Sequence, residues 1–197
     1  MAFLEKLEMA IKMKKLLKGA MGSLKMLNSL LILFLILFSS NAPAYESLVT
    51  SEDELKTAFI YQFTKYVKWP DSKKNKQEVV IGVIANDDTF KAISRLNGRL
   101  SQGARITVVP VKDISQLKNI DILYLEKGHI ADDIISEAVK HHILTISDEE
   151  DATDKGVIIT LFMADSRLRF NINLKVAKQS HLKFSSRLLS LANTIIR

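Results

Sequence analysis

The chain of 197 residues contains no cysteine. This absence excludes thiol catalysis, thiolate metal sites and internal disulfides. A domain of about 150 residues does not need disulfides, because a core of that size buries most of its apolar side chains. The nucleophile motif G-x-S-x-G and the dinucleotide motif G-x-G-x-x-G are missing as well. An active site built from scattered residues stays open, but we expect no enzyme and no cofactor.

The sequence also lacks a metal-binding pattern. None of its four histidines is followed by another at the spacing of a helical zinc site, and the pair His141-His142 is expected to end a helix. The acidic run 148–154 fails as a calcium loop, because Ala152 and Thr153 stand where a ligand and a glycine are needed. We therefore expect no metal, and a solvated loop between two strands.

Near the N-terminus, the unbroken apolar run from Leu30 to Phe38 follows several lysines and precedes Ala42-Pro43-Ala44. This order is typical of a secretory signal peptide, here cleaved after Ala44. The alternative is a retained membrane anchor, which needs roughly 20 apolar residues, whereas the stretch 26–38 is only thirteen residues long and includes Asn28 and Ser29. The prediction is a signal peptide over 1–44 and a mature domain over 45–197 that works in the periplasm.

The positive charge of the chain belongs largely to this leader. Residues 1–44 hold six lysines and two glutamates, out of 28 basic and 22 acidic residues in the whole chain. The mature chain therefore keeps 22 basic and 20 acidic residues, a net charge of +2. A balance so close to neutral gives no reason to expect nucleic acid as a partner.

Ser51 and Glu54 form a capping-box pattern that opens a helix, and Trp69-Pro70 stops it after Lys68. Its apolar stripe is Leu55, Ala58, Phe59, Phe63, Tyr66 and Val67, with Ile60 at the edge. Tyr61 falls on the opposite, polar side, where folding alone gives no reason for an aromatic ring. We therefore take Tyr61 as the candidate partner-binding residue, together with Trp69 at the helix end. The alternative is that Tyr61 packs on a neighbouring loop or that the helix is buried on both sides.

Apolar runs over 79–84, 106–111, 120–125 and 143–146 predict strands covered on both faces, with helices over 86–96 and 131–142 between them. The link 113–119 is short for a parallel crossover. Residues 157–162 and 168–173 predict an antiparallel hairpin, and a docking helix follows from about Phe184, with Leu188 and Leu191 on its apolar face. The fold class is α/β: a single three-layer domain, with a mostly parallel sheet, an antiparallel C-terminal hairpin and flanking helices.

Three stretches together resemble the YfiR family of periplasmic proteins. They are the aromatic helix 58–70 ending in Trp69-Pro70, the strand 80–84, and the ending that runs from 169–173 to 182–192. In that ending, Asn173 and Ala177 match the family pattern N-x-x-x-A, and 185–192 match S-S-x-L-L-x-L-A. The chain departs from the family in having no cysteines for disulfides, and Gly156-Val157 where paired glycines are common.

The resemblance implies a periplasmic repressor. Such a protein binds the periplasmic domain of an inner-membrane diguanylate cyclase and holds the enzyme inactive. Envelope stress relieves the block, cyclic di-GMP rises and biofilm forms. The family also has members without a known partner, so a periplasmic small-ligand receptor or transport component, using the carboxyl edge of the sheet, stays as the alternative. A homodimer stays open as well.

Overall fold

The computed structural model of the chain describes residues 51–71 and 77–197. The predicted signal peptide, its cleavage after Ala44 and most of the polar linker 71–77 lie outside these residues.

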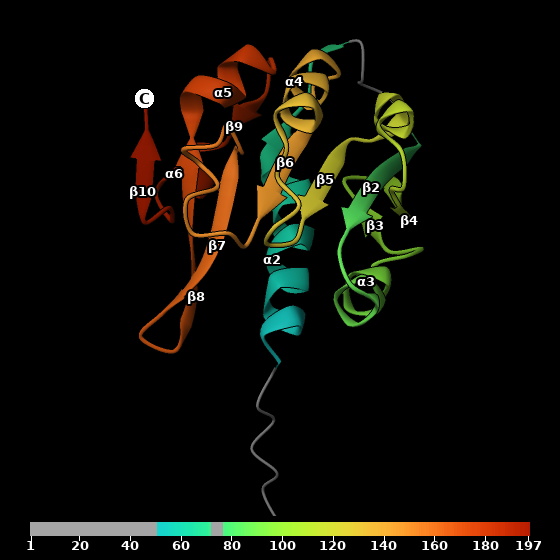
Figure 1. Cartoon of the computed structure of the whole chain (residues 1–197), viewed down its shortest axis with the longest axis horizontal. Coiled ribbons are helices and arrows are strands. Elements are labelled where there is room, and N and C mark those ends of the chain that lie inside the picture. Colours follow the sequence, from blue (N-terminus) through green and yellow to red (C-terminus); the bar gives the residue numbers. More distant parts are fainter. Residues whose placement is uncertain (1–50, 72–76) are drawn as a thin grey trace, which may run out of the picture. The chain divides into compact units, whose positions relative to one another are not determined.

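Within these residues, eight strands form one sheet in the order β10-β8-β7-β6-β5-β2-β4-β3 (Figure 1). The five strands from β7 to β4 in that order are mutually parallel, whereas β8 pairs antiparallel with β7, and β3 with β4. The strands are β2 (Glu78–Ile84), β3 (Leu100–Ser101), β4 (Ala104–Pro110), β5 (Ile122–Leu125), β6 (Leu144–Ser147), β7 (Ile159–Ala164), β8 (Arg167–Asn173) and β10 (Thr194–Ile196). The predicted α/β class, mostly parallel sheet and C-terminal hairpin are confirmed.

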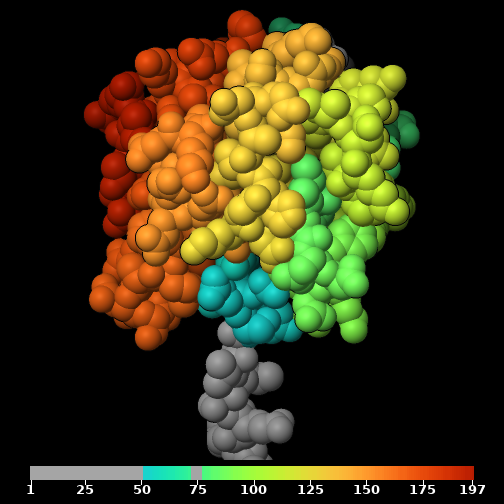
Figure 2. Space-filling model, viewed as in Figure 1, coloured from blue at the N-terminus to red at the C-terminus, as the bar shows by residue number. Residues whose placement is uncertain are grey.

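Helices cover both faces of this sheet, because its central strands are apolar on both sides. In β5, Ile122 and Tyr124 join one hydrophobic core, and Leu123 and Leu125 join the other. The first core is covered by α2 (Glu52–Tyr66), α3 (Asp87–Ser94), α5 (Leu174–Gln179) and α6 (Ser186–Leu189). The second is covered by α4 (Asp132–Lys140) and the 3₁₀ helix η2 (Ile114–Asn119). In Figure 2 the yellow-orange atoms of α4 lie at the top centre of the face turned to the reader.

The short link between β4 and β5 does cross over in parallel. It passes β2, which lies between the two strands. Asp113 accepts a hydrogen bond from the Ser115 amide, and the Gln116 side chain accepts one from the Asp113 amide. This capping box lets six residues of tight 3₁₀ helix make a connection that usually takes longer.

Helix α2 begins at the predicted cap, where Ser51 accepts a hydrogen bond from the Glu54 amide over 3.2 Å. It ends at Tyr66, two residues earlier than predicted. Val67 and Lys68 instead form β1 (Val67–Lys68), which pairs antiparallel with β9 (Lys183–Phe184). The buried surface of α2 is also wider than the predicted apolar stripe. Ala58, from the predicted apolar stripe, is exposed, whereas Thr57 and Thr64, on the predicted polar side, are buried. Lys56 is buried as well.

The predicted C-terminal helix is wrong beyond its first turn. Helix α6 ends at Leu189, and β10 adds a parallel strand at the edge of β8. The β-branched residues 194–196 favour a strand, and β8 offers them an unpaired edge. Consequently Leu188 is buried as expected, but Leu191 is 64% exposed.

The acidic loop 148–154 links β6 to β7, as predicted, but it is not simply solvated. Ala152 and Thr153 are buried. Glu149 accepts a hydrogen bond from the Gly128 amide over 2.9 Å and pairs with Lys155. The Glu149 carboxylate therefore holds the loop in place.

Candidate interaction surface

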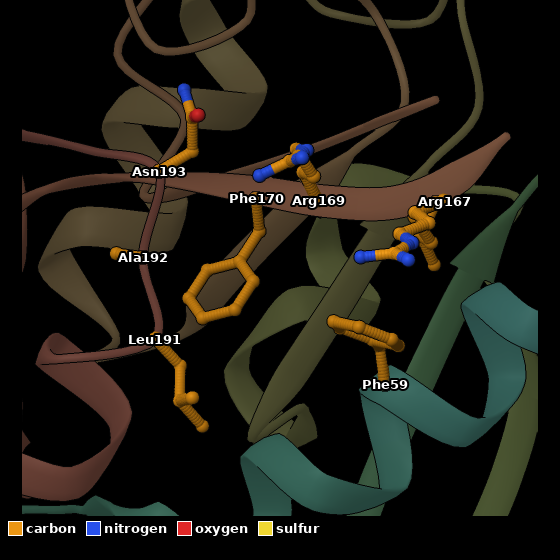
Figure 3. Close-up of a pocket in the computed structure, with 8 residues that line it drawn as sticks. Phe59, Arg167, Arg169, Phe170, Leu191, Ala192 and Asn193 are labelled. Carbon is orange, nitrogen blue, oxygen red and sulfur yellow. The ribbon is translucent and has the colours of Figure 1, made fainter. Parts of the chain in front are cut away.

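An apolar groove lies between α2, β8 and the segment that joins α6 to β10. Its volume is about 300 Å³, and it is lined by Phe59, Arg167, Leu168, Arg169, Phe170, Leu191, Ala192 and Asn193. Figure 3 shows the Phe170 ring hanging from β8, with Leu191 on one side and Phe59 on the other. The groove is therefore built by segments that lie far apart in the sequence.

The floor of the groove is made of aromatic rings that pack on one another. Phe59 and Phe170 pack edge to face with ring centroids 5.9 Å apart, and Phe170 packs on Phe63 in the same way at 5.4 Å. Edge-to-face packing of this kind adds stability beyond the area that it buries. Phe63 and Phe170 are buried, while Phe59 is half-buried at the surface. Folding therefore leaves apolar surface exposed to solvent here, with Leu191 beside the packed rings of Phe59 and Phe170.

Arginines border this floor. Arg167 is exposed, and Arg169 lies 3.5 Å from Asp165 in a surface ion pair. Arginine and aromatic side chains are the types enriched where proteins bind each other. The sequence predicted the hairpin that contains β8, but it did not predict the groove. The exposed leucine appears only because the C-terminal helix stops at Leu189.

Tyr61 lies away from this groove, on the side of α2 that faces β3. Its hydroxyl donates a hydrogen bond to the Leu100 carbonyl oxygen over 3.0 Å. Lys65 Nζ lies 4.1 Å from the ring centroid, and the Arg99 guanidinium lies 4.9 Å from it. The ring is half-buried and packs against the first core. Folding therefore does give this ring a role, and two cations lie over it.

Trp69 lies at the other end of α2, after β1. Its indole N–H donates to the Asp121 carbonyl oxygen over 3.2 Å, which fixes the ring. The side chain is half-buried and lines a second groove, of about 630 Å³, between β1, α5 and β9. The structure therefore does not bring Tyr61 and Trp69 into one site.

At the carboxyl edge of the parallel strands, polar groups bond to one another. The Glu126 carboxylate accepts from the Asn86 amide and side chain and from the Thr89 hydroxyl. Lys56 reaches Asp148, which also accepts from the Lys127 amide. Burial alone would lower the pKa of Lys56, but the hydrogen bonds that it donates to Asp148 and Glu52 raise that pKa above its ordinary value. This edge is the usual ligand position of an open α/β sheet, and here Lys56, Asp148 and Glu126 already have partners within the protein.

Three of the histidines lie at the ends of helices. His141 ends α4 and its Nε2 lies 2.8 Å from a Glu137 oxygen, as the capping interpretation expects. His142 and His181 each adopt positive φ after a helix, and their rings meet edge to face at 5.1 Å. Across residues 51–71 and 77–197, no three His, Cys, Asp or Glu side chains gather in a way that could hold a metal ion. In the same part of the chain, none of the helices is long and apolar enough to span a membrane.

Comparison with known families decides the assignment. The sequence profile of the YfiR/HmsC-like family, DUF4154, matches residues 53–193. The chain belongs to this family. No curated protein matches this YfiR/HmsC-like chain.

Two solved structures are similar to it. One is described as a conserved domain protein from Vibrio cholerae, with 13% identity and a TM-score of 0.49, over 74% of this chain and 60% of that one. The other is described as an ABC domain in complex with L-Trp from Streptococcus pneumonia, with 10% identity and a TM-score of 0.42. That match covers 60% of this chain and 55% of the other. The YfiR/HmsC-like chain thus spans well under two thirds of either structure.

The motif residues that this YfiR/HmsC-like chain shares with its family serve mainly to build the fold. Asn173 caps α5 by accepting from the Val176 amide over 3.0 Å, and its side-chain amide donates to the Thr153 carbonyl oxygen. Ala177 is fully buried. Ser185 caps α6 by accepting from the Leu188 amide over 3.1 Å. Asn173 and Ser185 thus each satisfy a helix end, and Ala177 fills the core.

Proposed function

We propose that this YfiR/HmsC-like protein is a periplasmic regulator that binds the periplasmic domain of an inner-membrane diguanylate cyclase and holds that enzyme inactive. Membership in the family supports a periplasmic regulator in general, with a regulatory role in preference to a catalytic one. The cyclase as target, and the control of cyclic di-GMP and biofilm that follows, are our extension of that role.

The observation that carries the proposal is the groove beneath Leu191. An apolar side chain that is 64% exposed stands beside the packed rings of Phe59 and Phe170, with Arg167 at the border. Hot spots of protein interfaces combine well-packed aromatic pockets with arginine, and truncating such a residue costs about 2 kcal/mol or more. A projecting apolar side chain of the cyclase domain would fill the groove and cover Leu191.

The alternative, a small-ligand receptor at the carboxyl edge of the sheet, has less support. Lys56, Asp148, Asn86 and Glu126 already pair within the protein there. A ligand at this edge would have to break those contacts and leave buried charge uncompensated, which is costly.

The test compares three exposed apolar residues, each replaced by aspartate, in cells that carry a cyclic di-GMP reporter. Leu191→Asp changes the groove. Leu100→Asp changes the surface beside Tyr61, with a side chain of similar exposure, 60%. Ile114→Asp, on η2, belongs to neither surface and is 40% exposed. We expect Leu191→Asp alone to raise cyclic di-GMP while the protein stays at its wild-type level.

Tyr61 and Trp69 remain predicted contact residues, and the same reporter separates them from the groove. If Tyr61→Ala and Leu100→Asp raise cyclic di-GMP and Leu191→Asp does not, the partner binds the β3 side of α2. If all variants are stable and none changes cyclic di-GMP, neither of these surfaces makes the repressing contact. If loss of the whole protein also leaves cyclic di-GMP unchanged, repression of a cyclase is the wrong function. Deleting the membrane cyclases one at a time in the Leu191→Asp strain identifies the target, because one deletion should restore the low level.

A further inference from the structure

The second groove, between β1, α5 and β9, collects positive charge around the fixed Trp69. Its lining residues are Lys68, Trp69, Pro70, Asp71, Lys178, His181, Leu182 and Lys183. Three lysines stand against one aspartate, so the lining carries a net charge of +2 when His181 is neutral.

The two-stranded sheet at this groove places like charges side by side. Lys68 lies directly opposite Lys183 in the antiparallel β1–β9 pair. Like charges at directly opposite positions destabilise a sheet. Among the described residues, the ion pairs do not include Lys68, Lys178 or Lys183. Folding therefore leaves a repulsion in place that an anionic partner would relieve.

The groove also has a pre-positioned apolar wall. The indole N–H of Trp69 is held by the Asp121 carbonyl oxygen, Pro70 follows it, and Leu182 is buried beneath. Aromatic side chains that are already fixed lose little conformational entropy on binding. The volume of about 630 Å³ lies within the usual range of ligand sites, roughly 300–1,000 Å³.

We propose that this groove binds an acidic segment of a protein partner, with carboxylates facing Lys68, Lys178 and Lys183 and an apolar side chain on Trp69. Charge complementarity selects an anion. The hollow, partly apolar lining selects a peptide over inorganic phosphate, which has no apolar part, and over a lipid surface, which is flat. The proposal does not depend on the cyclase or on the groove beneath Leu191.

Trp69 is the sole tryptophan of the chain, so its fluorescence reports on this groove alone. The experiment titrates the purified protein with a short synthetic peptide of glutamate and leucine, and in parallel with inorganic phosphate and with vesicles that contain phosphatidylglycerol. We expect a saturable change in Trp69 fluorescence with the peptide, weaker at high salt because the contacting charges are exposed. Phosphate and vesicles should produce none.

The variants assign the binding to the lysines. In Lys68→Gln/Lys183→Gln, the peptide affinity should fall about tenfold, which equals roughly 1.4 kcal/mol for the two contacts. The control Lys112→Gln/Lys118→Gln removes the same charge from exposed lysines around η2. Its affinity for the peptide should equal that of the wild-type protein. Folding is monitored separately: the first variant should melt at the wild-type temperature or above it, because a repulsion is removed. No binding, equal affinities in the two variants, or equal responses to phosphate or vesicles would each overturn the proposal.

Discussion

Lys56 Nζ donates a hydrogen bond to Asp148 Oδ2 over 2.7 Å, across 92 positions of sequence. The contact joins the first turns of α2 to the residue that follows β6. Lys56 also lies 2.8 Å from Glu52, and its side chain is only 8% exposed. A buried ion pair of this kind gives no large net gain in stability, but it is costly to break.

Lys56→Met is therefore expected to destabilise the protein by about 3–5 kcal/mol, because Asp148 is left charged and largely buried. The loss is a large share of a typical stability of about 5–15 kcal/mol. Urea unfolding measures it. The double variant Lys56→Met/Asp148→Asn should recover part of the loss, and additive effects of the two changes would show that the pair is not coupled.

The acidic loop predicts a dependence of stability on pH. The hydrogen bond from Lys155, and next the Gly128 amide, lower the pKa of Glu149 below its ordinary value of 4.5. The folded state thus favours the ionised carboxylate, so its stabilisation is complete above about pH 4.5 and is lost as the pH falls through the lowered pKa.

Thermal unfolding of Glu149→Gln tests this dependence. Its melting temperature should lie below the wild-type value at pH 7, and the gap should close in acid. Glu150→Gln is the matched control, since Glu150 is an exposed neighbour, and it should show no gap at either pH. A gap for Glu149→Gln that stays constant from pH 7 into acid would contradict the assigned ion pair.

Gly82, in the middle of β2, is required by close packing. A Cβ at this position would lie 2.7 Å from Val111 Cγ2 and 3.0 Å from Ile120 Cδ1. Gly82→Ala should therefore cost about 1–3 kcal/mol through overpacking. Adding Val111→Ala makes room, so the double variant should be less unstable than the sum of the two single changes. Simple additivity in urea unfolding would show that the backbone yields instead.

Leu188 and Leu191 make a matched pair on either side of the end of α6. Leu188→Ala should cost about 2–5 kcal/mol, because its side chain is 3% exposed in the first core. Leu191→Ala should change the stability by no more than about 0.5 kcal/mol. Calorimetry of the two proteins compares them, and equal melting temperatures would mean that the C-terminal segment is packed differently.

Local patterns in the sequence determined most of the secondary structure. The apolar runs that became β2, β4, β5 and β6 need both faces covered wherever they lie, and Ser51 and Asn86 cap the helices that follow them. These signals depend on residues within a few positions of each other, so the sequence shows them directly. The hairpin of β7 and β8 was readable for the same reason.

Only the tertiary structure decided what happens after Leu189. Residues 184–196 have the periodicity of an amphipathic helix, but the unpaired edge of β8 offers the last three residues a set of backbone hydrogen bonds. A competing partner more than 20 residues away in the sequence is invisible to periodicity. The exposed Leu191, the pairing of Lys56 with Asp148 and the two grooves all follow from such long-range contacts, since each joins side chains that become neighbours only when the sheet is complete.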